Sequence, residues 1–409
     1  MAPAGDRTSL QAAIQAGADS IYFGVGHLNM RSKSTNNFTI DSLPEVADLC
    51  RSHGVKTYLT INTVLYNDDL PYMKTLIDRA REAGITAIIA SDQAAISYAH
   101  KQRMRVHIST QANISNIDMV EFYSQFADVM VLARELNLDQ VSEITRQITA
   151  RNITGPSGNL VRVEIFAHGA LCMAVSGKCY LSLHTYNTSA NRGACRQNCR
   201  HAYHVESDDG NELEIDNEFI MSPKDLCTID FIDQILSAGV SILKIEGRGR
   251  SPEYVKTVTR CYKEAICAAA DGIYTSEKIQ AWKSRLSEVY NRGFWDGYYL
   301  GRKLGEWSDH RGSAATMKKI YAGDILNYFP RANTAHSKLK SESLNIGDSV
   351  LILGETTGVV EHKIESLRVD HSTVTKASKG EECTFSLPVK VRTGDKLYLR
   401  VPRDASLNT

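Results

Sequence analysis

The residues of this chain that could do chemistry gather in one stretch. Five of its nine cysteines, Cys172, Cys179, Cys195, Cys199 and Cys227, lie close together in the sequence. Six, fifteen and three residues separate the first four of them. Only the gap between Cys195 and Cys199 has the short spacing of about two to four residues that zinc fingers use, and the other two gaps are too wide to form a second such pair. Dense but unevenly spaced thiolates are typical of an iron–sulfur cluster that is held from separate loops.

Zinc, redox-active or unliganded thiols, and disulfides are the alternatives. The chain opens with Met1-Ala2-Pro3-Ala4-Gly5, which does not resemble a secretion signal, and no apolar run approaches the length of a membrane span. We therefore expect a cytoplasmic protein without membrane association, in which thiols stay reduced and disulfides are rare. The remaining cysteines are expected to be core residues: Cys50, Cys261, Cys267 and Cys383.

Charge gives no global indication of a nucleic-acid partner. The 409 residues, enough for two or three domains, include 47 Lys and Arg and 47 Asp and Glu. A local basic surface could still form around Arg192, Arg196, Arg200 and His201. A solvated loop is the simpler explanation of these four residues.

The first part of the chain alternates short apolar strands with amphipathic helices. Val55 to Ile61 and Ile85 to Ala90 have the pattern of strands, and helical patterns follow at Tyr72 to Ala83 and Gln93 to Gln102. This alternation indicates parallel βα units. About eight units predict an α/β fold, a (β/α)8 TIM-like barrel over residues 1–272, although the first strand is short of residues.

Three further segments complete the predicted organisation. An insertion at about 167–220 carries four of the five clustered cysteines, with a hairpin over 202–218 and a strand near Phe219 to Ser222. Residues 273–314 form a helical and aromatic connector. From residue 315 the hydrophobic period changes to two, so residues 315–409 are predicted to form a small antiparallel β-barrel.

Polar residues follow the predicted strands, where a parallel barrel gathers its chemistry. The catalytic candidates are His168, Lys244, Glu246 and Arg248, and the substrate-binding candidates include Asn62, Gln111 and Lys224. Lysine and arginine together could hold a small dicarboxylate. The alternative is a structural ion pair between Lys244 and Glu246.

Several long motifs resemble the collagenase-like peptidase family U32. They are the segment from Glu164 to Cys172 that continues through Ser182, the opening Ala2 to Asp6, Asn29-Met30-Arg31, Asn191 to Cys195, and Lys244 to Arg248. The resemblance covers nearly the whole chain. It adds Arg31 and Arg192, which stand in these motifs, to the substrate-binding candidates.

The resemblance implies a function that differs from the historical peptidase label. Members of the family are iron–sulfur proteins in oxygen-independent hydroxylation of tRNA wobble uridine, ribosomal RNA cytidine or ubiquinone precursors. Their cluster ligands correspond to Cys172, Cys179, Cys195 and Cys227, with Cys199 as the alternative fourth ligand. The terminal β-barrel is most similar to the branch of tRNA hydroxylation protein P, which implies 5-hydroxyuridine as product and prephenate, a dicarboxylate, as the co-substrate that donates the hydroxyl group.

Three functions from different classes follow. The first is a tRNA hydroxylase that draws a base of the anticodon loop into the barrel mouth. The second is a peptidase, for which His168 and Cys172 are the candidate pair. The third is a cluster-bearing scaffold or electron-transfer protein. An RNA partner could bind the arginine-rich loop at 192–200 or basic residues of the terminal barrel: Lys318, Lys319, Arg331, Lys338 and Lys340.

Overall fold

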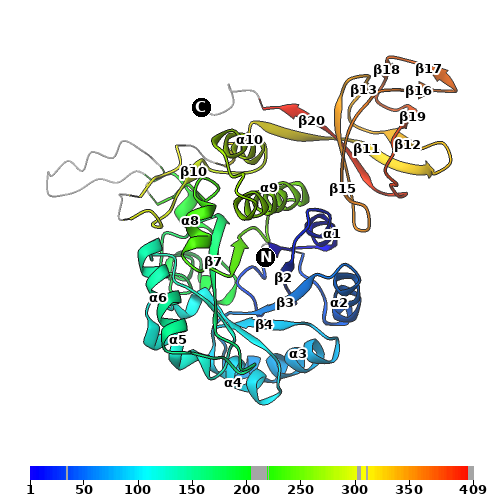
Figure 1. The fold of residues 1–409 in the computed structure, drawn as a ribbon. Coiled ribbons are helices and arrows are strands. Elements are labelled where there is room, and N and C mark those ends of the chain that lie inside the picture. The colour runs from blue at the N-terminus through cyan, green and yellow to red at the C-terminus, as the bar shows by residue number, and fades with distance from the viewer. Residues whose placement is uncertain (34–35, 204–218, 220, 302–304, 310–311, 404–409) are drawn as a thin grey trace.

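The computed structural model describes residues 1–33, 36–203, 219, 221–301, 305–309 and 312–403 (Figure 1). An α/β unit comes first in the chain, and a β-rich unit follows it. The hairpin predicted over 202–218 lies almost entirely outside the described residues. None of the described helices is long and apolar enough to cross a membrane.

Eight parallel strands form the centre of the α/β unit. Strands β1 to β7 pair in chain order, and β9 pairs with β7. Their bounds are β1 (Ala2–Pro3), β2 (Ser20–Gly24), β3 (Lys56–Ile61), β4 (Ala87–Ala90), β5 (Val106–Ile108), β6 (Val129–Val131), β7 (Arg162–Gly169) and β9 (Ile242–Ile245). Most of their residues are buried, as expected when helices cover a parallel sheet. The predicted α/β fold is therefore confirmed.

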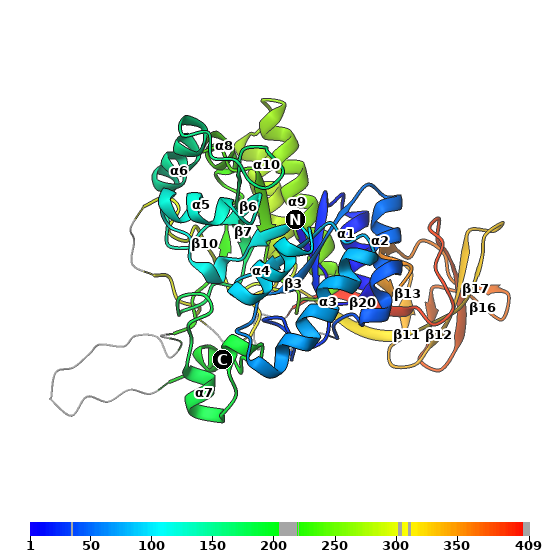
Figure 2. The ribbon, with the colours of Figure 1, turned by 90° about the horizontal axis from the view of Figure 1, so that it is seen from below.

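A helix follows each of these strands and covers the sheet from outside (Figures 1 and 2). The helices are α1 (Arg7–Gln15), α2 (Leu43–Ser52), α3 (Leu70–Glu82), α4 (Gln93–Lys101), α5 (Ile117–Ser124), α6 (Leu138–Ala150), α8 (Ile232–Ser237) and α9 (Pro252–Ala270). Local caps set several of their starts, because free N–H groups of the first turn need acceptors. Asp6 accepts from the Ser9 backbone N–H at 2.7 Å, and Asn137 and Gln140 form a capping box on α6.

Backbone hydrogen bonds also link the first and last parallel strands. The terminal amine of Met1 donates to the Leu243 carbonyl oxygen at 2.7 Å, and the Ile245 N–H donates to the Met1 carbonyl oxygen at 3.1 Å. The short β1 is thus held between β2 and β9.

The long connection from β7 to β9 carries the clustered cysteines. It includes α7 (Leu181–Tyr186), 3₁₀ turns at Ala190–Arg192 and Asn198–Arg200, and β8 (Asp225–Cys227). Figure 2 shows α7 standing out from the strands, away from the C-terminal sheet. The strand predicted near Phe219 to Ser222 is instead β8, antiparallel to the end of β7. Pro223 forms an isolated bridge with Trp307, and the strand β8 begins two residues later, at Asp225.

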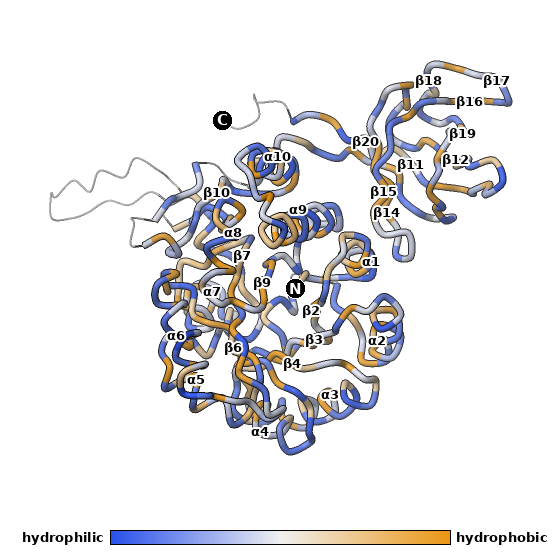
Figure 3. The backbone as a smooth tube through the Cα atoms, viewed as in Figure 1, coloured by the Kyte–Doolittle hydropathy of each residue, from blue (hydrophilic) through white to orange (hydrophobic). Residues whose placement is uncertain are grey.

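The C-terminal unit is an antiparallel sheet that follows α10 (Ser276–Ser287) and β10 (Phe294–Trp295). The strands of its main sheet lie in the order β15-β14-β20-β11-β12-β19-β16-β17. They are β11 (Met317–Phe329), β12 (Thr334–Leu339), β14 (Ser349–Gly354), β15 (Gly358–Lys363), β16 (Arg368–Val369), β17 (Ser372–Thr373), β19 (Glu382–Ser386) and β20 (Lys396–Pro402), while β13 (Leu344–Asn345) pairs with β18 (Lys376–Ala377). The antiparallel character predicted for this region is confirmed. Figure 3 shows hydrophobic and hydrophilic residues alternating along these strands.

The C-terminal sheet docks on α1 and α9. Leu351, Leu353 and Val359 bury a small cluster with Ala12 of α1. The Gln15 side chain donates to the Thr357 carbonyl oxygen at 2.7 Å and accepts from the Val359 N–H at 3.0 Å. The contact fixes the sheet beside the helices, away from the cysteine-bearing connection.

Candidate functional site

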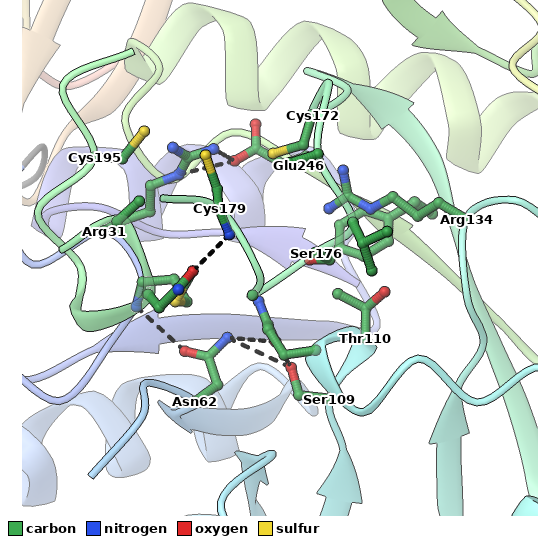
Figure 4. A pocket seen from close by; sticks show the side chains of 18 of the residues that line it. Arg31, Asn62, Ser109, Thr110, Arg134, Cys172, Ser176, Cys179, Cys195 and Glu246 are labelled. Atoms are coloured by element: carbon green, nitrogen blue, oxygen red, sulfur yellow. Dashed lines mark hydrogen bonds and ion pairs between the residues drawn. The ribbon is translucent and has the colours of Figure 1, made fainter. Parts of the chain in front are cut away.

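A cavity of about 140 Å³ lies at the carboxyl ends of the parallel strands (Figure 4). Residues from five strands line it: Tyr22, Thr60, Ile89, Phe166 and Lys244. This is the end of a parallel α/β unit where ligands bind. We refer to this cavity as the cysteine pocket.

Four thiols line the cysteine pocket, those of Cys172, Cys179, Cys195 and Cys199. Figure 4 shows the first three of them around Arg31 and Glu246. The Cys179 N–H donates to the Asn191 side-chain oxygen at 3.1 Å. This hydrogen bond joins the segment that carries Cys172 and Cys179 to the segment that carries Cys195 and Cys199.

A glycine lets the segment that carries Cys195 approach the loop after β2. Gly193 has a φ of +82°, and a Cβ there would lie 2.3 Å from the Asn29 carbonyl oxygen. Only glycine fits such a left-handed, crowded position. The backbone conformation and the close contact therefore explain why a glycine stands two residues before Cys195.

Cys199 lines the cysteine pocket and Cys227 does not, whereas the sequence-based ligand set preferred Cys227. Burial and then the neighbouring Cys172, Cys195 and Cys179 raise the pKa of Cys199. Cys227 instead lies in β8, paired with β7, and accepts from the Tyr262 hydroxyl at 3.9 Å. Burial raises the pKa of its thiol to about 11.

The donor chemistry of the pocket suits soft metal centres. Within the ranges that the structure describes, no group of three or more His, Cys, Asp or Glu side chains is placed to hold a metal ion. The four thiols instead surround a common cavity. Thiolates are the ligands that iron–sulfur clusters use, and they come here from separate turns of one connection.

A buried ion pair lies at the base of the pocket. The Lys244 ammonium is 2.7 Å from a Glu164 carboxylate oxygen, and His107 lies 3.5 Å from the other oxygen. Burial would raise the pKa of Glu164, but Lys244 and His107 outweigh it and lower the pKa to about 2. The pair of Lys244 with Glu246 that was considered as the alternative to ligand binding is not formed, because β7 places Glu164 beside Lys244 in the interior.

Glu246 pairs with Arg31. Its carboxylate accepts from Arg31 Nη2 at 2.7 Å and from Nε at 3.2 Å. Burial acts to raise the pKa of Glu246, but the charges of Arg31 and Arg250 prevail and hold it at about 2. Arg31 also lies close enough to Cys172 and Cys195 for their charges to raise its pKa.

Two other arginines of the pocket have no carboxylate partner among the described residues. Arg248 is buried, and its Nη1 donates to the Asn29 side-chain oxygen and the Thr60 hydroxyl, both at 2.9 Å. Burial lowers its pKa to about 10. Arg134 stacks 3.9 Å from the centre of the Phe166 ring and donates to the Ala170 carbonyl oxygen at 3.3 Å. Unpaired cations are costly away from water, so the pocket favours an anionic ligand.

Amides and a hydroxyl form the polar wall of the pocket opposite these arginines. Asn62 donates to the Gln111 side-chain oxygen at 3.2 Å, and Ser109 also hydrogen-bonds that oxygen. Asn62 accepts from the Met30 N–H at 3.3 Å. The structure thus brings Asn62, Gln111, Lys244, Glu246 and Arg248 together, as the strand ends indicated, and it adds Arg31, which the family resemblance had suggested.

Three predicted residues lie outside the cysteine pocket. His168 is buried, with its Nδ1 3.3 Å from the Tyr262 hydroxyl, and burial lowers its pKa to about 3. Lys224 pairs with Glu306 at 3.0 Å. Arg192 pairs with Asp69 at 2.6 Å and stacks on Tyr66. We find these three side chains engaged with other protein groups.

Arg134 is the pocket residue that the sequence interpretation missed. It lies two residues after Leu132, which forms an isolated bridge just beyond β6. Its position two residues past an apolar strand segment was the available signal.

The fold and the site define an α/β protein with a thiol-lined, cationic pocket at its strand ends. The chain belongs to peptidase family U32, whose sequence model matches residues 5–309. It is 57% identical to a protein named Collagenase from Porphyromonas gingivalis, over 97% of this chain and 96% of the relative.

Other members of the family carry names from RNA modification. The tRNA hydroxylation protein P1 of Bacillus subtilis is 30% identical, over 90% of this chain and 86% of that protein. A 23S rRNA 5-hydroxycytidine synthase of Escherichia coli is 33% identical, over 66% of this chain and 39% of that protein.

Proposed function

We propose that this protein hydroxylates a pyrimidine of RNA without molecular oxygen, converting the wobble uridine of tRNA to 5-hydroxyuridine with the help of an iron–sulfur cluster. The observation that carries the proposal is the pocket in which four thiols meet two arginines that have no carboxylate partner in the described part of the chain. Relatives named for tRNA and rRNA hydroxylation support the substrate class.

The cluster ligands that we propose are Cys172, Cys179, Cys195 and Cys199, with Cys199 in place of Cys227. A bound [4Fe–4S] cluster would supply electron transfer at the pocket. Arg31 lies near the thiols, and its positive charge would offset part of the negative charge of the thiolates.

Arg134 and Arg248 would bind the two carboxylates of a small dicarboxylate, for which prephenate is the candidate. Lys244 and Arg31 are already paired with Glu164 and Glu246, so the surplus positive charge belongs to Arg134 and Arg248. Guanidinium groups hold carboxylates with two directed hydrogen bonds. The acid would lie beside the thiols.

We further infer that the eight parallel strands close into a (β/α)8 barrel. The hydrogen bonds of Met1 with Leu243 and Ile245 support closure between β1 and β9. Closure would give the pocket the rigid floor that precise binding requires.

Peptidase activity is the second candidate, because the 57% identical relative is named Collagenase. A thiol peptidase needs a low-pKa cysteine beside an available base. Burial lowers the pKa of His168, the candidate base, to about 3, and His168 does not line the pocket that Cys172 lines. The geometry therefore favours hydroxylation.

Nucleoside mass spectrometry of tRNA from a deletion strain tests the proposal. The wobble 5-hydroxyuridine derivatives should disappear and should return with the wild-type gene but not with the Cys199→Ala variant. A strain that carries no second enzyme for this modification is required. Unchanged levels of these nucleosides in that strain would exclude the proposed function.

A further inference from the structure

A second cavity, of about 150 Å³, adjoins the cysteine pocket. The loop from Cys172 to Ser176 lines both cavities, and so does Arg134. The far wall of the second cavity is aromatic and consists of Trp295, Tyr298 and Trp307. We refer to it as the aromatic pocket.

The aromatic wall is held in place by backbone pairing. Trp295 lies in β10, where it pairs with Leu226 of β8, and its ring centre is 5.1 Å from that of Tyr298. Trp307 forms a bridge with Pro223, and the Ser308 N–H donates to the Ser222 carbonyl oxygen at 2.8 Å. Flat rings on a fixed wall are suited to stacking on a planar ligand.

The polar groups of the aromatic pocket do not suit a dianion. Its lining has one cation, Arg134, and one carboxylate, Glu135. The other polar side chains of the lining are those of Asn113, Ser176 and Tyr298, which are uncharged. A neutral planar ring matches this lining better than a dicarboxylate does.

Size and surroundings indicate a single six-membered ring. A cavity of roughly 150 Å³ is known to take benzene, and the aromatic pocket has a similar volume. Exposed apolar side chains of the cysteine-bearing connection stand near the shared loop, with Met173 47% and Val175 48% exposed. Such groups help to receive an unstacked nucleotide.

We propose that the aromatic pocket binds the extruded pyrimidine base of the RNA substrate. This inference rests on the proposed function and assigns the two cavities different ligands: the base to the aromatic pocket and the small acid to the cysteine pocket. The shared loop from Cys172 to Ser176 would bring the two ligands side by side at the thiols.

Photocrosslinking tests the location directly. An anticodon stem-loop with 4-thiouridine at the wobble position is irradiated with the anaerobically purified full-length protein, and the linked peptides are sequenced. Links should fall on peptides that contain Trp295, Tyr298 or Trp307. Links confined to residues 315–403 would overturn the inference.

Kinetics separate the base from the acid. Trp307→Ala should raise the KM for tRNA about tenfold or more, the loss expected when a base loses its stacking partner, and should leave the KM for prephenate unchanged. Trp307→Phe should restore tRNA binding, and Phe122→Ala, an exposed aromatic residue on α5, serves as the matched control.

Two outcomes would refute the assignment of the base. A Trp307→Ala variant with a raised KM for prephenate alone would place the acid in the aromatic pocket. An unchanged KM for both would leave the pocket without either ligand. If the wild-type protein hydroxylates tRNA in these assays, only this inference falls; if the wild type forms no product at all, the proposed function falls.

Discussion

The cysteine pocket and the C-terminal sheet both carry basic residues, but those residues are used differently. In the C-terminal sheet Lys340 and Lys396 both contact Asp324, at 2.5 and 2.8 Å, and Lys319 lies 2.8 Å from Glu253 of α9. In the cysteine pocket two arginines have no carboxylate partner among the described residues. Cations that are already paired stabilise a fold, whereas unpaired ones are available to a ligand.

This difference between paired and unpaired cations changes which basic residues we expect to contact RNA. Five basic residues of the C-terminal region were expected to contact RNA. Three of them have carboxylate partners: Lys319, Lys338 and Lys340. The partner of Lys338 is Glu382, at 3.5 Å. Arg200, in the other candidate segment, donates to the Leu171 and Pro223 carbonyl oxygens. The exposed Lys178 and Arg196 beside the cysteines are the better candidates for phosphate contacts.

The largest expected effect concerns the cluster. Cys199→Ala should remove the about four iron atoms that a [4Fe–4S] cluster contributes, whereas Cys227→Ala should retain them, because only Cys199 lines the pocket. Iron and sulfide analysis of anaerobically purified protein measures this. Retention of iron in Cys199→Ala together with its loss in Cys227→Ala would reverse the ligand assignment.

Removing one partner of the buried pair should destabilise the fold. Glu164→Gln leaves the Lys244 ammonium uncompensated, which typically costs about 3–5 kcal/mol in the free energy of unfolding. Urea unfolding measures this loss, and Glu143→Gln, which breaks an exposed pair on α6, is the control. Equal stability of the two variants would show that the buried pair has no special role.

The same carboxylate predicts a pH dependence. Glu164 titrates at about 2 in the folded protein, below its value of about 4.3 in an unfolded chain. The carboxylate therefore contributes stability above about pH 4.3, and this contribution is lost as the pH falls towards 2. The acid-induced loss of stability between these values should be smaller in Glu164→Gln than in the wild type.

Loss of an unpaired arginine should weaken binding of the small acid. Arg248→Ala should cost about 2–5 kcal/mol of binding, the usual value of a buried charge-assisted contact, without loss of iron. Arg192→Ala is the matched control, because Arg192 is paired with Asp69 outside the pocket. Equal KM values for prephenate in the two variants would contradict the distinction between paired and unpaired arginines.

The smallest expected effect is on the salt dependence of tRNA binding. It distinguishes an RNA surface beside the cysteines from one on the C-terminal sheet. The combined variant Lys178→Ala and Arg196→Ala should lower the salt dependence of tRNA binding by about 0.7 for each lost phosphate contact to a single strand. Lys338→Ala combined with Lys340→Ala should leave it unchanged. Titrations of tRNA binding at several salt concentrations measure both variants. A reduced salt dependence in the Lys338 and Lys340 variant alone would place the RNA site on the C-terminal sheet.

The sequence predicted which residues lie at the site better than it predicted which of their side chains pair with one another. Strand ends are visible as apolar runs followed by polar residues, so Asn62, Gln111 and Arg248 could be placed near one another. The pairing of Lys244 with Glu164 could not, because it joins strands 80 residues apart in the chain. The position of Glu164 inside an apolar strand of a covered sheet was a signal that it points to the interior.

The spacing of the cysteines in the sequence could not show whether Cys199 or Cys227 lies in the pocket. It depends on the pairing of β8 with β7, which holds Cys227 away from the cysteine pocket, and on distant contacts such as the bridge between Pro223 and Trp307. Such a contact between distant segments leaves no local periodicity in the sequence.

The most direct measurement of the central claim is anaerobic hydroxylation of an unmodified tRNA by the purified, cluster-loaded protein, with nucleosides analysed by mass spectrometry. We predict that 5-hydroxyuridine forms only when the small acid is present, that Cys227→Ala remains active, that Cys199→Ala is inactive, and that Arg248→Ala needs a much higher concentration of the acid. Absence of 5-hydroxyuridine with iron-replete wild-type protein and prephenate, together with hydrolysis of peptides by the same preparation, would contradict the account.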